Sequence, residues 1–390
     1  MSVTQGSGAS MQSLLLSHSR NKKRRRRRKD GSEPKKPIDC IRHHINNASR
    51  LKSVPTGESQ ANDGKNHNVI CLLFLIIDEL PYEEIWRKWV KAPVMPGSHA
   101  HDSTSVKVFV HAKYPEQVKS KWVKQHLIEK TFCPGWGTVQ LTKAMVELAR
   151  VALLNTKEEA SQQADIKFLY ASESCIPICT LSDATARLFS KESKNKSWMR
   201  VKFKPRNGYN GSSQWVPIEN SGVIPPECVC KADQWVALTR EHANAVLDLP
   251  RNITGLQQNF NVWGSFQKGC ASDEMFFPTL LSCCGLLPNR KTCSDGSHSI
   301  AKVGLESKLY ETVDMKQRLT YVVWNYADFG NFGGDKKSLC DRPEAFDAFS
   351  EELVLRGLKE GCIFVRKVKD KKLSVEGWSE IVQRASSTQR

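Results

Sequence analysis

The sequence has no apolar run long enough to form a membrane-spanning helix. Its longest run, residues 69–77, contains nine apolar residues and ends at Asp78, whereas a helix needs about 20 to cross a bilayer. No membrane anchor and no cleavable signal peptide are therefore evident. The run instead predicts a strand that is buried on both faces of a mostly parallel sheet.

The sequence also lacks the short motifs of several common enzyme classes. It contains neither the glycine-rich loops that cradle nucleotide phosphates nor the motifs G-x-S-x-G and H-E-x-x-H. No D-x-D lies at the end of an expected strand, where such a pair would hold a divalent metal against a diphosphate. The 13 cysteines include no C-x-x-C pair, so a zinc site is not indicated. We therefore expect no bound metal and no resident cofactor.

Positive charge is concentrated near the start of the chain. The net charge is +17, and residues 20–37 contribute +9 of it, from eleven Lys or Arg and two acidic residues. Residues 1–66 are rich in Ser, Gly, Asn, Lys and Arg and lack Phe, Trp and Tyr, which predicts a disordered polybasic extension. The run KKRRRRRK at 22–29 is a nuclear-localisation signal, a contact for nucleic acid or anionic lipid, or a solvated tail.

From residue 67 onward, short apolar runs alternate with amphipathic segments. The composition, 39% hydrophobic and 25% charged, suffices for a core. The alternation favours an α/β fold with a mostly parallel, Rossmann-like sheet flanked by helices. The middle, residues 191–226, is expected to form loops with a short ribbon at 214–217, and the last dozen residues are expected to be frayed. The expected strands are 69–77, 106–110, 166–170, 233–238, 319–324 and 362–368, and the expected helices are 82–90, 141–154, one that opens at 239, and 346–355.

Polar residues stand where the first three expected strands end. In sheets of this kind a ligand binds beyond the carboxyl ends of the strands, and those ends carry Asp78, His111 and the run Ser-Glu-Ser at 172–174. Taken singly such residues are weak indicators. His111 is equally consistent with a core histidine, and an acidic residue such as Glu274 often begins a helix. Together they make a ligand cleft at this edge a physical expectation.

Eight blocks of the sequence, taken in order, resemble one family, the core-2/I-branching glycosyltransferases, which include the peptide O-xylosyltransferases and a large plant group. Two blocks are specific: FLYASESCIP at 168–177 is close to the family's FVLLSESCIPL, and SDEMFFPTL at 272–280 is close to PDEHYFPTL. The eight blocks span roughly residues 69–368. The other six are FLIIDELPYEEIWRKWV (74–90), VFVH (108–111), Trp136-Gly137 with the segment 141–154, DQWVALTREHA (233–243), LTYVVW (319–324) and IFVRK (363–367).

The resemblance implies a GT-A-type glycosyltransferase domain over residues 67–385 that uses a UDP-sugar. Family members invert the anomeric carbon by direct displacement and need no metal ion, which fits the missing D-x-D. By position, Glu274 would be the base that takes the proton from the acceptor hydroxyl, a role worth about 10²–10⁴ in rate. Lys367 and Arg342, with Arg366 as the alternative arginine, would stabilise the charge of the leaving diphosphate.

The resemblance also implies where the substrates bind. Trp324 and Tyr326 have the W-x-Y pattern with which the branching enzymes recognise a glycan or glycoprotein acceptor, and Asp273 is expected beside them. Lys113 stands where the family has an aspartate, so the chain departs from the pattern at this nucleotide contact. The motifs leave the donor sugar open between GlcNAc, xylose and glucuronate. The residues expected to bind the UDP moiety, besides Arg342 and Lys367, are Ile77, Asp78, His111, Lys113 and Thr138.

Two other interpretations stay open. A non-catalytic relative that binds a nucleotide or a sugar is compatible with the departure at Lys113. A basic nucleic-acid-binding protein would account for residues 22–29, but no nucleic-acid-binding motif follows, and we expect no such partner. The family works in the Golgi lumen behind an N-terminal anchor. The 13 cysteines and four N-x-S/T sequons favour that lumen, while the lack of a visible anchor leaves membrane association open.

Overall fold

The computed structural model describes residues 67–93, 103–203, 214–256, 261–267, 269, 271–290, 311–323 and 343–389, and of 250–256 and 389 it describes the backbone alone. All of them lie in the second of the two units into which the chain divides, Lys36–Arg390. The predicted extension at 1–66 lies outside these residues. None of the helices described is both long and apolar enough to cross a membrane.

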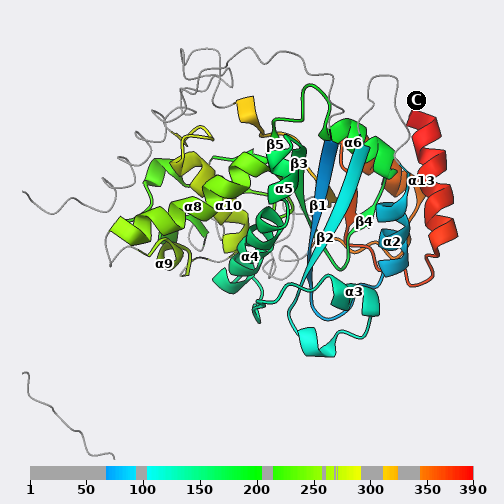
Figure 1. Ribbon diagram of the computed structural model, residues 1–390, viewed down its shortest axis with the longest axis horizontal. Helices are drawn as coiled ribbons and strands as arrows, with labels where there is room; N and C mark the ends of the chain where they lie inside the picture. Colours follow the sequence, from blue (N-terminus) through cyan, green and yellow to red (C-terminus); the bar gives the residue numbers. More distant parts are fainter. Residues whose placement is uncertain are drawn as a thin grey trace, which may run out of the picture. The chain divides into compact units, whose positions relative to one another are not determined.

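The centre of the described part is a six-stranded sheet (Figure 1). In spatial order its strands are β2 (Ser103–Ala112), β1 (His67–Ile76), β3 (Asp165–Ser172), β8 (Ala237–Thr239), β5 (Ser197–Trp198) and β9 (Val313–Asp314). β1 pairs in parallel with both β2 and β3, and β5 pairs in parallel with β9, whereas β8 runs antiparallel to both of its neighbours. The expected α/β fold with a mostly parallel sheet is therefore confirmed.

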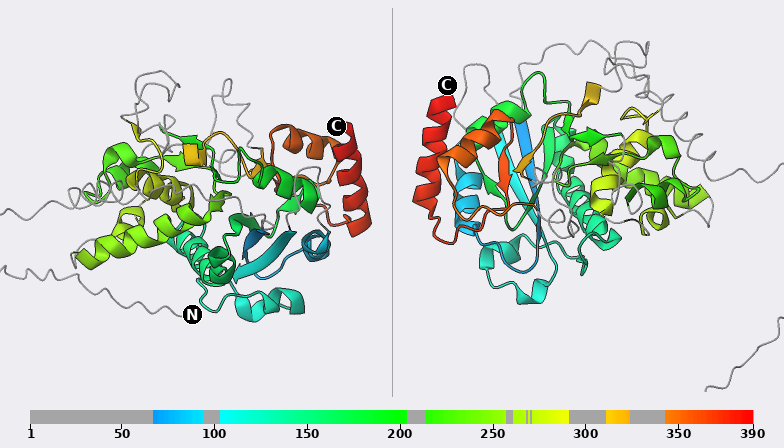
Figure 2. Two further views of the ribbon diagram at one scale, coloured as in Figure 1. Left: turned by 45° about the horizontal axis from the view of Figure 1, so that its top comes forward. Right: turned by 180° about the vertical axis from the view of Figure 1, so that it is seen from behind.

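Each face of the sheet carries its own hydrophobic core, because successive side chains of β1 point to opposite faces. One face is covered by α4 (Val139–Leu154), α8 (Arg240–Leu256) and α10 (Ser272–Cys283), and the other by α2 (Glu83–Lys91), α6 (Leu181–Leu188), α12 (Glu351–Lys359) and α13 (Val375–Gln389). The odd-numbered residues from 69 to 75 belong to the first core and the even-numbered residues from 70 to 76 to the second. Figures 1 and 2 show the two groups of helices on opposite sides of the sheet.

The expected helix after the first strand is α2, and its two tryptophans fix it to the second core. Trp86 and Trp89 are fully buried, and their indole nitrogens donate to the carbonyls of Cys175 at 3.2 Å and Cys179 at 2.9 Å. Both indole rings also meet Phe364 edge to face. Residues three apart lie on one face of a helix, so this spacing joins α2 to segments that lie about 90 and 280 positions later in the chain.

A second sheet supports the end of the chain. It consists of β10 (Thr320–Val322), β11 (Phe364–Arg366) and β4 (Ile176–Pro177), with β11 in the middle. The Trp378 indole of α13 donates to the carbonyl of Pro177 at 2.8 Å, and Trp378, Val382 and Ala385 are buried. The expected fraying of the last dozen residues is therefore wrong, because apolar residues at helical spacing give α13 a face that packs against α2 and α12.

Two further expectations about elements are wrong. Residues 214–217 do not form a ribbon but lead into α7 (Val216–Glu219), because Trp215 and Ile218 are buried and Pro217 suits the first turn of a helix. The helix expected at 346–355 begins only at Glu351, where the Leu353 amide donates to the capping Ser350 hydroxyl at 3.2 Å. The remaining elements are α3 (Lys121–Gln125), α5 (Lys157–Ser161), α9 (Val262–Gln267), β6 (Val201–Lys202), β7 (Lys231–Ala232) and the 3-10 helices η1 (Pro115–Gln117) and η3 (Pro226–Cys228).

Candidate active site

The carboxyl ends of β1, β2 and β3 meet at one edge of the sheet. Leu75 of β1 pairs with His111 of β2 on one side and with Ser172 of β3 on the other. The register therefore places the predicted nucleotide-binding histidine and the start of the Ser-Glu-Ser run on either side of the end of β1. This is the edge at which a mostly parallel sheet presents its ligand site.

The loops that follow β1 and β2 lie beside each other. The Tyr114 amide donates to the carbonyl of Ile77 at 3.0 Å, and the Lys113 ammonium lies 5.2 Å from the centre of the Tyr114 ring. The Ile77 side chain is 50% exposed, and Asp78 is half-buried. The structure thus brings Ile77, Asp78 and Lys113, three of the residues predicted to bind UDP, to the same edge.

His111 lies inside the fold rather than on the surface of this edge. It is 1% exposed, and its Nε2 accepts a hydrogen bond from the Phe132 amide at 2.8 Å. Burial lowers the pKa of His111 from 6.5 to about 4, because an imidazolium would have to give up its hydration. The imidazole is therefore neutral at physiological pH and holds the Phe132 segment against β2.

The N-terminus of α10 lies beside the start of α4 (Figure 1). The Ala271 amide, just before α10, donates to the carbonyl of Gly137 at 2.8 Å. This bond helps to hold Ala271 in the left-handed region at φ 51°, which costs a residue with a Cβ about 1–2 kcal/mol. Thr138 follows Gly137 and is exposed. It therefore lies near the first turn of α10, which carries Asp273 and Glu274.

Glu274 is held at the first turn of α10 by two residues from other parts of the chain. Its Oε2 lies 2.6 Å from Lys231 Nζ, on β7, and accepts a hydrogen bond from Gln214 Nε2 at 3.3 Å. Its side chain retains 18% of its exposure. Pro278 comes four residues later and has no N–H to donate to the Glu274 carbonyl, so the helix ladder is interrupted there.

Asp273, next to Glu274, has a different environment. It is 6% exposed, and its Oδ1 has no hydrogen-bond partner among the residues that the structure describes. Burial and the neighbouring Glu274 carboxylate raise the pKa of Asp273 from 3.8 to about 7, while Lys231 and Arg366 act in the opposite direction. Asp273 is thus partly protonated at neutral pH. Its expected contact with an acceptor stays a prediction.

Arg366, at the end of β11, brings positive charge to the same place. Its guanidinium lies 5.1 Å from the centre of the Trp235 ring, and its Nε donates to the Ser172 hydroxyl at 3.2 Å. Lys367 follows it and is half-buried, with its carbonyl accepting from the Phe346 amide at 2.8 Å. The ends of β3 and β11 therefore meet, and the charge of Arg366 acts on Asp273 at the first turn of α10.

Three of the predicted site residues lie outside the described residues: Arg342, Trp324 and Tyr326. For them the roles implied by the resemblance stay predictions. Within the described part of the chain, no group of three or more His, Cys, Asp or Glu side chains has an arrangement that could hold a metal ion.

The sequence did not identify the two residues that contact Glu274. Gln214 and Lys231 lie 60 and 43 positions before it, Gln214 just before α7 and Lys231 on β7. The only signal in the sequence is that Lys231 stands two positions before the DQWVALTREHA block. Lysines near polar segments are too common for this position to have been distinguished.

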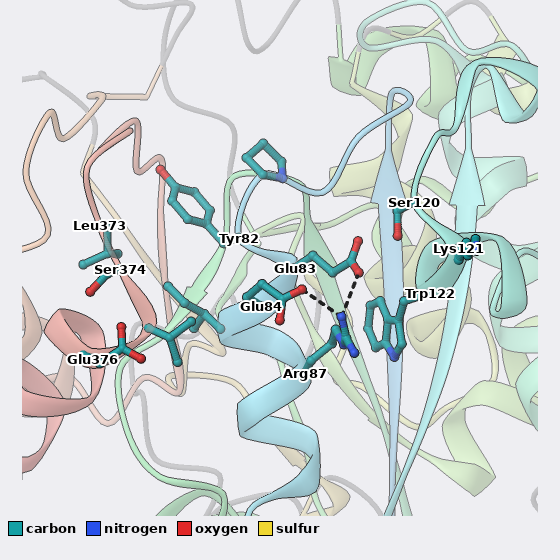
Figure 3. Close-up of a pocket in the computed structure, with 13 residues that line it drawn as sticks. Tyr82, Glu83, Glu84, Arg87, Ser120, Lys121, Trp122, Leu373, Ser374 and Glu376 are labelled. Carbon is teal, nitrogen blue, oxygen red and sulfur yellow. Dashed lines mark hydrogen bonds and ion pairs between the residues drawn. The ribbon is translucent and has the colours of Figure 1, made fainter.

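A separate cavity of about 660 Å³ lies between the first turn of α2, the start of α3 and the start of α13 (Figure 3). Its charged residues include Glu83, Glu84 and Glu376, and Arg87 makes ion pairs with Glu83 at 3.8 Å and Glu84 at 2.8 Å. None of the residues predicted to bind substrates lines it. Arg87 is thus engaged by carboxylates, and the cavity does not belong to the site around Glu274.

Comparison with known families identifies the chain. Residues 94–347, more than half of the sequence, match the family model described as Core-2/I-Branching enzyme. A search of curated proteins finds no match. The matched range includes the α10 turn with Glu274 and the edge formed by His111 and Ser172. The chain therefore belongs to the Core-2/I-Branching enzyme family and is a glycosyltransferase.

Proposed function

We propose that the protein is an inverting, metal-independent transferase that moves a sugar from a UDP-sugar to a hydroxyl of a glycan or glycoprotein. The candidate donor sugars are GlcNAc, xylose and glucuronate. One observation carries the proposal: the Glu274 carboxylate is partly exposed and is contacted by the Lys231 ammonium at 2.6 Å. The adjacent Asp273 is within reach of the charge of Arg366, which bonds Ser172 at the end of β3. We expect the protein to work in the Golgi lumen, as its family does, with membrane association still open.

Glu274 would act as the general base. A sugar hydroxyl is a poor nucleophile, so a carboxylate within hydrogen-bond reach of it lowers the barrier by removing the proton as the oxygen attacks C1. Lys231 supports this role because its ammonium, 2.6 Å from Oε2, holds the carboxylate in place. The bond from C1 to the diphosphate oxygen breaks as the new glycosidic bond forms, and the proton ends on Glu274.

Protein cations would stabilise the leaving UDP. Lys367 follows β11 and lies next to the Arg366 side chain that already reaches Ser172 and Trp235. Because Arg366 is engaged in these contacts, Arg342 remains the preferred arginine for the diphosphate. A lysine acts on phosphate oxygens as a point charge and an arginine as a two-pronged donor, and the sequence provides no D-x-D to hold a metal there.

The remaining predicted residues would place the two substrates. Ile77, Asp78 and Lys113 lie at the edge where UDP would bind, and Thr138 lies near the first turn of α10. His111 would act by supporting the wall of the UDP site. Aromatic faces stack on the C–H surfaces of sugars, so Trp324 and Tyr326 would bind the acceptor, with Asp273 nearby.

The test is transfer by the full chain with UDP-GlcNAc, UDP-xylose and UDP-glucuronate, in EDTA, to short O-glycans and serine-containing peptides. We expect turnover of one donor in EDTA and a loss of about 10²–10⁴-fold for Glu274→Gln with unchanged UDP affinity by calorimetry. Turnover that requires added Mn²⁺ would contradict the assignment of Lys367 and Arg342. Full activity of the variant would contradict the assignment of Glu274.

A second candidate is a non-catalytic relative that binds a nucleotide or a sugar. It is favoured by Lys113, which replaces the family's aspartate and lies over the Tyr114 ring. UDP binding by calorimetry without turnover of any donor would establish this alternative. Absence of both binding and turnover would exclude it together with the transferase.

A further inference from the structure

Lys231 and Glu274 form a close ion pair in a largely buried position. The Lys231 ammonium lies 2.6 Å from Glu274 Oε2, and the two side chains retain 16% and 18% of their exposure. At such a site the attraction is screened less by water than at the surface. The pair also joins two elements that are far apart in sequence, β7 and α10.

Gln214 closes this contact into a triangle. Its Nε2 donates to Glu274 Oε2 at 3.3 Å, and its Oε1 accepts from Lys231 Nζ at 3.1 Å. The Gln214 side chain is itself buried, with 4% exposure. Each member therefore contacts the other two, so the carboxylate of Glu274 is fixed in orientation.

The contacts of Glu274 that the structure describes fall on one of its two carboxylate oxygens. Both the ion pair and the amide hydrogen bond that the structure describes are made by Oε2 of Glu274. A general base needs an oxygen that is free to approach the hydroxyl and is held within a few tenths of an ångström of the productive geometry. Within the described residues Oε1 makes no such contact, and rotation of the carboxylate would break both contacts of Oε2, so we assign the role of the base to Oε1.

We propose that Lys231 is the positioning residue of the catalytic base, acting with Gln214 to hold Oε2 of Glu274 so that Oε1 takes the acceptor proton. The inference rests on the proposed function. The alternative role for Lys231, a cation that binds the diphosphate, is disfavoured because its ammonium is already engaged by Glu274 and Gln214.

The test is steady-state kinetics of the full-length Lys231→Met, Lys231→Arg and Glu274→Gln variants with the UDP-sugar that the wild type turns over. A misplaced catalytic group costs up to about 100-fold in rate. We therefore expect Lys231→Met to lower kcat by about 10- to 100-fold and to leave the KM for the donor and the Kd for UDP within about twofold. Lys231→Arg, which restores a cation, should recover much of kcat.

Two controls separate positioning from folding. Lys107→Met removes a lysine in the middle of β2 that pairs with Glu159 of α5, and it should leave kcat unchanged. Thermal unfolding of each variant shows whether the fold persists. Introduced into Glu274→Gln, the Lys231→Met change should lower the residual rate less than twofold, because Lys231 acts through the carboxylate that is already missing.

The outcomes distinguish this inference from the proposed function. If the wild type transfers a sugar and Glu274→Gln does not, the function stands. An unchanged kcat in a folded Lys231→Met protein then overturns the positioning role alone. A tenfold weaker Kd for UDP with unchanged kcat also overturns it, because Lys231 would belong to the donor site. Absence of transfer by the wild type, or full transfer by Glu274→Gln, overturns both.

Discussion

Asp273 and Glu274 are adjacent carboxylates at the first turn of α10, but their surroundings differ. Glu274 makes an ion pair with Lys231 at 2.6 Å, whereas Asp273 is buried and its Oδ1 has no hydrogen-bond partner in the described part of the chain. Burial and the charge of Glu274 raise the pKa of Asp273 to about 7. Asp273 is thus partly protonated near neutral pH, which reduces the repulsion between the two adjacent carboxyl groups.

The raised pKa of Asp273 predicts a pH-dependent stability. Between pH 4 and 7 the folded state holds a proton that the unfolded state releases, so Asp273 makes the protein less stable as pH rises. The asparagine of an Asp273→Asn variant cannot ionise. The free energy of unfolding of the variant minus that of the wild type should therefore rise by roughly 1–4 kcal/mol between pH 4 and 7. Urea unfolding at several pH values measures this difference, with the exposed Asp347→Asn as control. A difference that does not change with pH would refute the prediction.

The buried His111 predicts the opposite pH dependence. Its pKa is lowered to about 4, so between pH 6.5 and 4 the unfolded state binds a proton that the folded state excludes. Stability should therefore fall as the pH falls through this range. Nitrogen-15 NMR of the histidine rings, with the His111 signal assigned from a His111→Gln variant, should show a neutral imidazole from pH 8 to 5. A titration midpoint near 6.5 would contradict the buried, neutral assignment.

Lys367 should contribute to the affinity for UDP. A hydrogen bond to a charged group is worth about 1.5–3 kcal/mol, so Lys367→Met should raise the Kd for UDP by about 10- to 100-fold. The loss should be smaller at high salt, where the charge is screened. Calorimetry with UDP measures both effects, and Lys359→Met, at the exposed end of α12, is the matched control. Equal affinities for the two variants would remove Lys367 from the diphosphate site.

The final helix should be needed for stability. Trp378 is 5% exposed and donates to the Pro177 carbonyl at 2.8 Å, so Trp378→Ala should lower the free energy of unfolding by about 3–5 kcal/mol. Trp378→Phe keeps much of the packing but removes the hydrogen bond to the Pro177 carbonyl. It should lower the free energy of unfolding by about 1–3 kcal/mol. Urea unfolding monitored by circular dichroism checks both values. A loss below about 1 kcal/mol for Trp378→Ala would mean that α13 does not pack as described.

The sequence predicted the elements whose patterns are set by local periodicity. A continuous apolar run specified β1, and the spacing of Trp86 and Trp89 specified α2, because burial on both faces or on one helical face leaves a pattern in consecutive residues. The periodicity did not predict the structure of residues 214–217, because a segment this short is compatible with either a strand or a helix. It also failed at the last dozen residues, whose packing against α2 depends on a segment almost 300 positions away.

The sequence by itself determined the family, the α/β class and the candidate base, because these depend on motifs of consecutive residues such as SDEMFFPTL. Only the tertiary structure decided which groups surround that base. Lys231, Gln214 and Arg366 come from three separate segments of the chain, and no local pattern records that they converge near Asp273 and Glu274. Their contacts with this turn and the burial of Asp273 depend on distances through space, which a chain acquires only when its sheet and helices have packed.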